Sequence, residues 1–328
     1  MTDTSTPDGS AVAPQPVTAE LIHQLCERVR TWRRWGEDDE LGTLNEADDA
    51  SRVHAAGLVR DGTIFSLALP FGSDGPQRGE FGRVNPIHVM LQDGGDIKSG
   101  AQKRFHMEFT DDAIYMPLQC GTQWDALAHF FHDGQMYNGW GTEFVTSSGA
   151  DKNSIDKSAS RFAGRGVLVD LPRAQGRDHL EPGEAITERE LRSCLEAQET
   201  ELRPGDFLLV RTGHLRVART RGSWDDFVGG SSPGMSVHSA AYLCEQRVAA
   251  VAIDTWTTEV VPFEHPPIRG CMHVILMVNG GIHLGEMFDL EALAEACAAD
   301  RRYEFLFVAP ALPITGAVGS PVNPLAIR

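Results

Sequence analysis

The sequence contains no run of 18 apolar residues, the length that a membrane-spanning helix needs, and its first residues lack the apolar core of a signal peptide. We therefore expect a cytoplasmic protein with no membrane partner. None of its six cysteines lies in a C-x-x-C pair, so the sequence fits neither a zinc ribbon nor a dense disulfide framework. Reduced thiols in the cytoplasm are the simplest interpretation.

Positive charge is also scarce, because 29 Lys and Arg residues face 46 Asp and Glu residues and the formal net charge is −17. A chain with so little basic charge repels a phosphate backbone, so we expect no nucleic-acid partner. What the sequence does have is size: 328 residues, 41% of them hydrophobic, suffice for a large buried core. These features predict a globular protein whose partner is a small molecule.

The order of the apolar patterns predicts an α/β fold over 18–328, preceded by a disordered tail, 1–17. The tail is rich in Thr, Ser, Pro and Asp and has too few large apolar side chains to offset the entropy of ordering it. Predicted strands alternate with predicted helices, which is typical of a sheet with helical crossovers. We expect helices from Thr18, over 46–60, 187–198 and 238–246 and from about Asp289, and strands over 63–69, 106–109, 114–118, 167–171, 206–212 and 248–254.

The segment 70–100 is rich in glycine and is too long for a plain connection between two elements. We expect it to be a lid over a pocket or an arm that contacts another subunit. His88 and His106 lie in or near this segment, and each stands alone without a second ligand at metal-binding spacing. We therefore interpret both as core or pocket-rim residues.

One short stretch, from Gln119 to His129, reads Q-C-G-T-Q-W-D-A-L-A-H and concentrates polar groups that can take part in chemistry. Gly121 permits backbone angles closed to other residues, so the chain can bend until the amides of Gln119 and Gln123 converge. Asp125 supplies a carboxylate and His129 an imidazole, which together suit metal-assisted or acid/base chemistry. From these residues alone, an ordinary turn with a capping Asp and a half-buried His is an equal alternative.

The stretch resembles the pattern H-x-G-T-H-x-D-x-P-x-H of the cyclase family of metal-dependent hydrolases, which includes bacterial kynurenine formamidase and isatin hydrolase. The positions that agree with the pattern are Gly121, Thr122, Asp125 and His129. The positions that depart from it, where the family has His, His and Pro, are Gln119, Gln123 and Leu127. The phrases W-G-E-D-D-E-L-G-T-L-N, G-D-F-L-L-V-R-T-G, S-P-G-M and V-A-I-D-T follow in family order, so the likeness extends over most of the chain.

This resemblance implies a single α/β domain of the swivelling β/α/β type around a mixed sheet, and a metal site assembled from distant parts of the chain. The family has a His at the head of a C-terminal strand and a Glu after the turn that follows, which correspond to His273 and Glu286. His283 is a competing ligand because it lies three residues before Glu286, although pairing of two strands favours His273. The implied metal ligands are Gln119, Gln123, Asp125, His273 and Glu286.

The two glutamines bear on the choice of metal. Amides in place of imidazoles make the ligand set harder, which favours Mn²⁺ and leaves Zn²⁺, Mg²⁺ and Ca²⁺ as alternatives, or reduces a two-metal centre to one cation.

The implied activity is hydrolysis of a C–N amide or lactone-type bond in a small cyclic or aromatic substrate, by a metal-activated water and with His129 as general acid/base. A metal-dependent cyclase or dehydratase would use the same groups, and a catalytically silent small-molecule-binding scaffold is a third alternative. We expect a homodimer or homotetramer, with the glycine-rich segment or the N-terminal helix at an interface. The candidate substrate-binding residues are Trp35, Trp124, Phe130, His132 and Tyr137.

Overall fold

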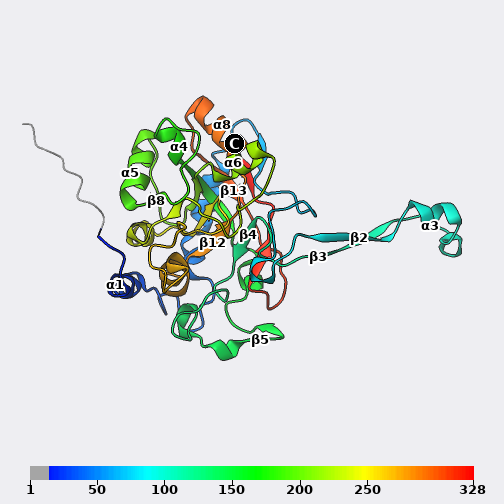
Figure 1. Cartoon of the computed structure of the whole chain (residues 1–328), viewed down its shortest axis with the longest axis horizontal. Helices are drawn as coiled ribbons and strands as arrows, with labels where there is room; N and C mark the ends of the chain where they lie inside the picture. Colours follow the sequence, from blue (N-terminus) through cyan, green and yellow to red (C-terminus); the bar gives the residue numbers. More distant parts are fainter. Residues whose placement is uncertain (1–14) are drawn as a thin grey trace, which may run out of the picture.

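The computed structural model describes residues 15–328 (Figure 1), so most of the predicted N-terminal tail lies outside the described residues. The predicted first helix is present as α1 (Ala19–Val29). Thr18 caps it, because its hydroxyl accepts a hydrogen bond from the backbone N–H of Leu21 at 3.2 Å. Its buried face consists of Ile22, Leu25, Cys26 and Val29.

A curled mixed sheet of nine strands organises the described residues, which confirms the predicted α/β fold around a mixed sheet. Its central strands β7, β9, β11 and β12 run parallel, and the strands on both sides of them pair antiparallel. The strands, in their order across the sheet, are β1 (Ile64–Ser66), β15 (Leu325–Ile327), β13 (Glu304–Val308), β7 (Ala163–Asp170), β9 (Phe207–Arg211), β11 (Ala250–Ile253), β12 (His283–Glu286), β4 (Gln123–Asp125) and β14 (Gly319–Pro321).

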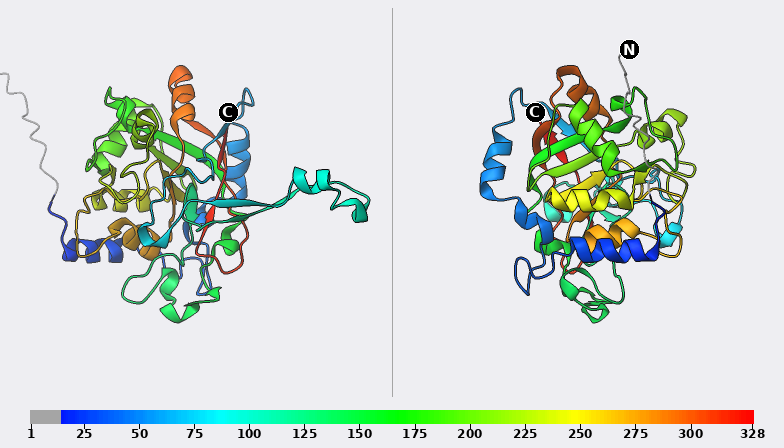
Figure 2. Two further views of the ribbon diagram at one scale, coloured as in Figure 1. Left: turned by 45° about the vertical axis from the view of Figure 1, so that its right-hand side comes forward. Right: turned by 90° about the vertical axis from the view of Figure 1, so that its left-hand side faces the viewer.

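Helices and loops cover both faces of the sheet, which explains why β9, β11 and β12 are buried along their whole length. On one face, α1, α7 (Ala240–Glu245) and the π-helical segment η8 (His273–Asn279) lie side by side (Figure 2). The opposite face is packed by α8 (Glu291–Asp300) and by a cluster of aromatic side chains.

Further α-helices of the body are α2 (Asp49–Ala56), α4 (Leu171–Ala174), α5 (Glu188–Ala197) and α6 (His214–Arg221). The capping box predicted at the start of α5 is present, since Thr187 caps the helix and the Glu190 carboxylate accepts from the Thr187 N–H at 3.0 Å. Across residues 15–328, every helix falls short of the length and apolar character that crossing a bilayer requires.

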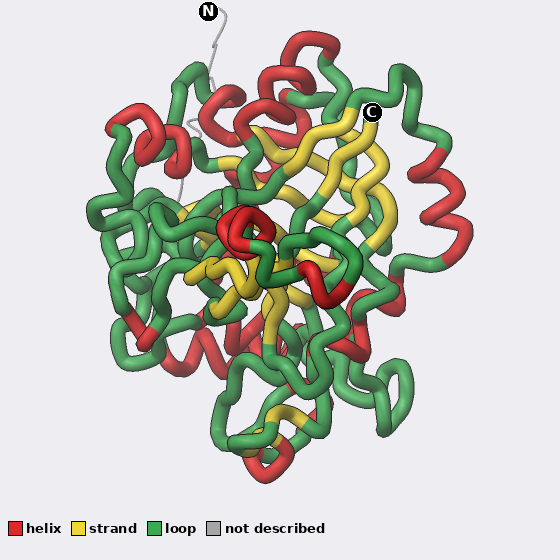
Figure 3. The backbone as a smooth tube through the Cα atoms, turned by 90° about the vertical axis from the view of Figure 1, so that its right-hand side faces the viewer, coloured by secondary structure: helices red, strands yellow, loops and turns green. Residues whose placement is uncertain are grey.

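The glycine-rich segment is not a plain loop, because much of it forms a projecting arm with the residues that follow. The arm consists of β2 (Ile87–Gln92), α3 (Gly94–Ser99) and β3 (Asp111–Tyr115), and it extends away from the body of the molecule (Figure 1). A view along it shows α3 standing in front of the body (Figure 3). Its role as a lid or as a contact between subunits stays a prediction.

The structure corrects the placement of the two isolated histidines. His88 lies in the arm and pairs with Asp112 at 2.7 Å, with both side chains more than half exposed. His106 is also exposed, and it sits in a left-handed turn with a φ of 55°. The predicted strand over 106–109 is therefore absent, and β3 begins only at Asp111. Neither histidine lies in the core.

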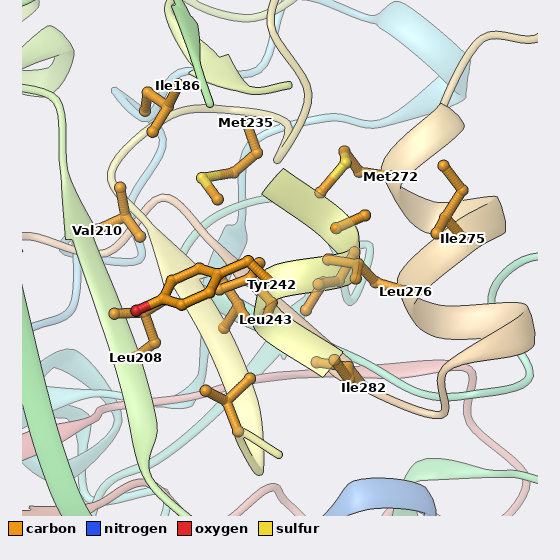
Figure 4. Packing of buried hydrophobic residues seen from close by; sticks show 14 of the residues in the cluster. Ile186, Leu208, Val210, Met235, Tyr242, Leu243, Met272, Ile275, Leu276 and Ile282 are labelled. Atoms are coloured by element: carbon orange, nitrogen blue, oxygen red, sulfur yellow. The ribbon is translucent and has the colours of Figure 1, made fainter. Parts of the chain in front are cut away.

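The predicted strand that begins at His273 is wrong, because this segment is the π-helical η8 and all seven of its residues are buried. A short run that is apolar all round fits a buried strand and a buried helix equally well, so periodicity alone does not separate them. The side chains of Met272 and Leu276 lie between η8 and the sheet, and Ile275 and Leu208 belong to the same buried cluster (Figure 4). This packing fixes the position of His273 in the first turn of η8.

Candidate functional site

The turn before β4 is held by side-chain contacts to neighbouring segments. The Thr122 hydroxyl donates to the carbonyl of Met287 at 2.6 Å and accepts from the N–H of Leu69 at 2.8 Å. Gly121 does not adopt the left-handed angles that its sequence context suggested. What requires glycine there is close packing, because a Cβ at this position would lie 2.9 Å from the ring of Phe71.

Strand pairing brings two distant polar residues together. β4 runs antiparallel to β12, and in this register Gln123 lies opposite Glu286. The amide nitrogen of Gln123 donates to Oε2 of Glu286 at 3.1 Å and lies 3.5 Å from Oδ1 of Asp125. Because side chains alternate along a strand, Gln123 and Asp125 share one face of β4 while Trp124 points to the other.

His273 completes a compact group with the two carboxylates. Its Nε2 lies 3.7 Å from Oδ2 of Asp125 and 3.6 Å from Oε1 of Glu286. All three side chains are buried, and one donor atom from each lies within 4.8 Å of the others. The family resemblance predicted that these three residues share one site although they are far apart in the sequence. The structure brings them together. His283, the competing ligand, faces away and packs edge-on against Phe162 with a centroid distance of 5.3 Å.

The group has the features of a cation site. Oδ2 of Asp125 and Oε1 of Gln123 are buried acceptors without a hydrogen-bond partner among the described residues. Leaving such oxygens unpartnered is costly, and a divalent cation would satisfy both. Two carboxylates, one imidazole and a free amide oxygen also form a donor set that divalent metals accept. The residues present therefore fit a bound divalent cation.

Glu259 is a member of the site that the sequence did not reveal. Its Oε1 accepts hydrogen bonds from Nδ1 of His273 at 2.6 Å and from the backbone N–H of the same residue at 3.0 Å. The Thr257 hydroxyl donates to its other oxygen at 2.6 Å. With its Nδ1 proton held there, His273 presents Nε2 to the two carboxylates, as a metal-binding imidazole requires.

The backbone of Glu259 packs closely against Gly234. This packing explains why the S-P-G-M segment has a glycine at that position. A Cβ at Gly234 would lie 2.4 Å from the backbone carbonyl of Glu259, so no larger residue fits there. A buried histidine ligand usually has an acid beside its second nitrogen, but no spacing in the sequence says which acid it is. Glu259 was missed for that reason.

Burial and mutual charge set the protonation of the group. Burial and the neighbouring charge of Asp125 raise the pKa of Glu286 to about 8, so this carboxyl holds a proton at neutral pH. Burial also opposes ionisation of Asp125, but the charges of His129 and His273 outweigh it and lower its pKa. A pair of close carboxylates therefore shares one proton, and a divalent cation would replace that proton.

The pKa of His273 and the pKa of Glu259, the acid bonded to it, shift in opposite directions. Burial by itself would lower the pKa of His273, but Glu259, Asp125 and Glu286 together hold it well above its ordinary value. In Glu259 the effect of burial is outweighed by the same imidazole, and its pKa falls to about 2. Glu259 therefore carries a negative charge at all physiological pH values.

His129 lies at the edge of the group. Its Nε2 is 3.7 Å from Oδ1 of Asp125, and its side chain is 20% exposed. Burial lowers its pKa despite the opposing influence of Asp125, so His129 is neutral near pH 7 and can accept a proton. The ring of Phe130 lies beside the group as well, 4.9 Å from the ring of His273.

The other predicted site residues do not join this group. Trp124 is fully buried in the core, stacked on Phe162 with a centroid distance of 4.8 Å. Tyr137 is also buried, and its hydroxyl donates to Asp39 at 2.9 Å. The guanidinium of Arg34 stacks on Trp35.

The two remaining predicted residues are His132 and Gln119. His132 is half-buried, and its nearest charged partner is Asp133 at 3.9 Å. Gln119 is buried with an unpartnered amide nitrogen, close to Gly319, the residue that pairs with Asp125 across the ladder between β4 and β14. Gln119 is thus next to the strand that carries the site, while no hydrogen bond within residues 15–328 links its side chain to the group.

Comparisons with known proteins agree with this architecture. The model of the cyclase family matches residues 22–260. A crystal structure described as that of a novel cyclase is 37% identical, with a TM-score of 0.83, and the match covers 92% of this chain and 99% of that one. Among curated proteins, none matches the chain.

More distant structures share the fold. Isatin hydrolase A from Labrenzia aggregata is 19% identical with a TM-score of 0.57, over 83% of this chain and 95% of that one. A predicted metal-dependent hydrolase from Bacillus stearothermophilus is 18% identical with a TM-score of 0.52, over 82% of this chain and 99% of that one.

We expect Glu259→Gln to weaken the binding of Mn²⁺ by about 10- to 100-fold, because the amide no longer fixes the orientation and basicity of His273. Calorimetric titration of metal-free protein measures this. The matched control is Glu264→Gln, since Glu264 instead binds Ser236 and the backbone N–H of Val237. Equal Mn²⁺ affinity in both variants and in the wild type would show that Glu259 does not support a ligand.

Proposed function

The chain belongs to the cyclase family, and we propose that it is a metal-dependent hydrolase that cleaves a C–N amide or lactone-type bond of a small cyclic or aromatic substrate. The observation that carries this proposal is the buried group of Asp125, His273 and Glu286, with donor atoms within 4.8 Å of one another. A neutral histidine at its edge supplies the base that hydrolysis needs.

Four residues would hold the cation. Asp125, Glu286 and His273 Nε2 would provide the charged and imidazole donors, and Gln123 would add its unpartnered amide oxygen. Gln119 is a further candidate beside β14. When bound, a divalent cation supplies Lewis-acid activation of water and of the scissile carbonyl.

His129 performs the proton transfers in this proposal. Its Nε2 accepts the proton of the attacking water while that water's oxygen bonds to the carbonyl carbon. The same nitrogen then returns the proton to the leaving nitrogen or oxygen as the scissile bond breaks. Asp125, 3.7 Å away, stabilises the imidazolium between these two steps. Phe130 offers an apolar face beside the group, which suits a ring in the substrate.

One observation favours the alternative of a catalytically silent scaffold. The amide nitrogen of Gln123 already donates to Glu286, so the carboxylates are partly satisfied without a cation. Calorimetric titration with several divalent cations separates the two functions, because a scaffold of this kind binds none of them. A cyclase or dehydratase would use the same groups, and product analysis distinguishes it from a hydrolase.

We expect Mn²⁺ to restore activity to metal-free protein better than Zn²⁺ does, because oxygen donors outnumber the single imidazole. The measurement is metal analysis of the purified protein followed by assays after reconstitution with each cation. Gln123→His adds a second imidazole at the centre of the group, and it should shift the preference toward Zn²⁺. Stoichiometric Zn²⁺ with full activity in the wild type would contradict this expectation.

His129→Asn should lower kcat by on the order of 10² to 10⁴ while Mn²⁺ affinity stays unchanged, because it removes a proton carrier and no metal ligand. A screen of formamides, cyclic imides, isatins and lactones with Mn²⁺ present identifies the substrate for this assay. His88→Asn is the control, since His88 lies on the exposed arm. A variant at position 129 that keeps wild-type turnover would remove His129 from the mechanism.

A further inference from the structure

A loop that precedes the arm lies against the turn before β4. We call residues 71–85 the site loop. Nε2 of Gln77 donates to the carbonyl of Cys120 at 2.9 Å, and both residues are buried. The ring of Phe71 contacts Gly121 in the same turn. The site loop is therefore anchored at two points next to the proposed metal ligands.

Asn85 makes the site loop compact. Its amide nitrogen donates to three carbonyls of the loop, at 2.9–3.2 Å. Its Oδ1 accepts from the N–H of Gln77 at 2.8 Å. A loop that is closed on itself and anchored to the turn holds its side chains in a defined position relative to the site.

Arg83 belongs to this loop and forms no ion pair within residues 15–328. Its side chain is half-buried, and its guanidinium lies 5.6 Å from the ring centre of Phe81. No carboxylate oxygen of residues 15–328 comes within 4.0 Å of it. The nearest acid in sequence, Glu80, directs its side chain toward Gly229 instead. A guanidinium without a carboxylate partner can bind an anion through its planar set of donors.

The anchoring of the site loop beside the turn brings the charge of Arg83 to bear on the proposed catalytic group. Burial is the largest influence on the pKa of Asp125, His129 and Glu286, and Arg83 acts on all three by lowering the pKa. Within residues 15–328, it is the one Lys or Arg side chain among the leading influences on these three groups. Its charge therefore acts on the same groups as the anchored site loop that carries it.

We propose that Arg83 binds a carboxylate of the substrate, so that the site accepts small molecules which carry a carboxylate in addition to the bond that reacts. A planar guanidinium matches a carboxylate in a bidentate pair, and one positive charge suits a monoanion better than a phosphate dianion. The bound carboxylate holds the scissile bond against His129 and the buried group. This inference rests on the proposed hydrolase function for the identity of the reacting bond alone.

The test uses two non-reactive probes that differ by one charge, 4-carbamoylbenzoate and uncharged terephthalamide. Calorimetry measures the binding of both to the Mn²⁺-loaded protein and to the metal-free protein. We expect the anion to bind about 10- to 100-fold more tightly than the neutral probe, the range of a charge-assisted hydrogen bond. The preference should persist without metal, because the charge of Arg83 does not depend on the cation.

Variants at position 83 show whether this residue is the source of the preference. Arg83→Gln should abolish it, and Arg83→Lys should keep part of it because the positive charge remains while the planar fork is lost. Arg78→Gln is the matched control: it removes the same charge from the same loop, but Arg78 binds the backbone carbonyl of Asp225. Equal binding of the two probes to the wild type, no binding of the anion, or a preference that survives Arg83→Gln would overturn the proposal.

Turnover separates this inference from the proposed function. Assays with 4-formamidobenzoate and 4-formamidobenzamide compare an anionic with a neutral formamide. Faster hydrolysis of the anionic compound, lost in Arg83→Gln mainly through a higher KM, supports both proposals. Hydrolysis without preference for the anion refutes the role of Arg83 and leaves the hydrolase standing. Preferential binding of the anionic probe with no hydrolysis of any compound refutes the hydrolase and leaves the role of Arg83 standing.

Discussion

The antiparallel pairing of β4 with β12 is the constraint on which the site depends, because it sets Gln123 opposite Glu286 and places Asp125 on the same face. Two buried carboxyl groups then lie within reach of one imidazole. Such a group is unfavourable unless protons, hydrogen bonds or a cation balance its charge. The shared proton, the charged imidazole and the Glu259 hydrogen bonds do so in the absence of metal. These are the same groups that would bind a divalent cation.

The two glutamines, Gln119 and Gln123, change the set of donor atoms that the site offers to a cation. In the family pattern these positions are histidines, and here Gln123 is neutral and forms a hydrogen bond with a carboxylate of the site. The change leaves one imidazole among oxygen donors, so the proposed site is adapted to a harder cation. The positive charge of Arg83 adds a second proposed specificity, for an anionic group at a distance from the reacting bond.

Helix caps could be predicted from the local sequence, and the grouping of the site residues from the family resemblance. Features that depend on tertiary packing could not be predicted. The cap of α1 and the capping box of α5 follow from short-range hydrogen bonds, so the sequence alone indicates them. The grouping of Asp125 with His273 and Glu286 came from the family resemblance, since no local rule joins residues so far apart. Tertiary packing determines the other features. The apolar segment that begins at His273 is a helix instead of a strand, and the side chain of Trp124 lies in the core instead of the site.

The proposed function requires that Asp125, His273 and Glu286 share one cation. A crystal structure of Mn²⁺-soaked protein, with anomalous scattering recorded to locate manganese, tests this most directly. We predict a single manganese peak that lies about 2.0 to 2.3 Å from one oxygen of each carboxylate and from Nε2 of His273. A manganese peak elsewhere, or an empty group at saturating Mn²⁺, would contradict the central claim.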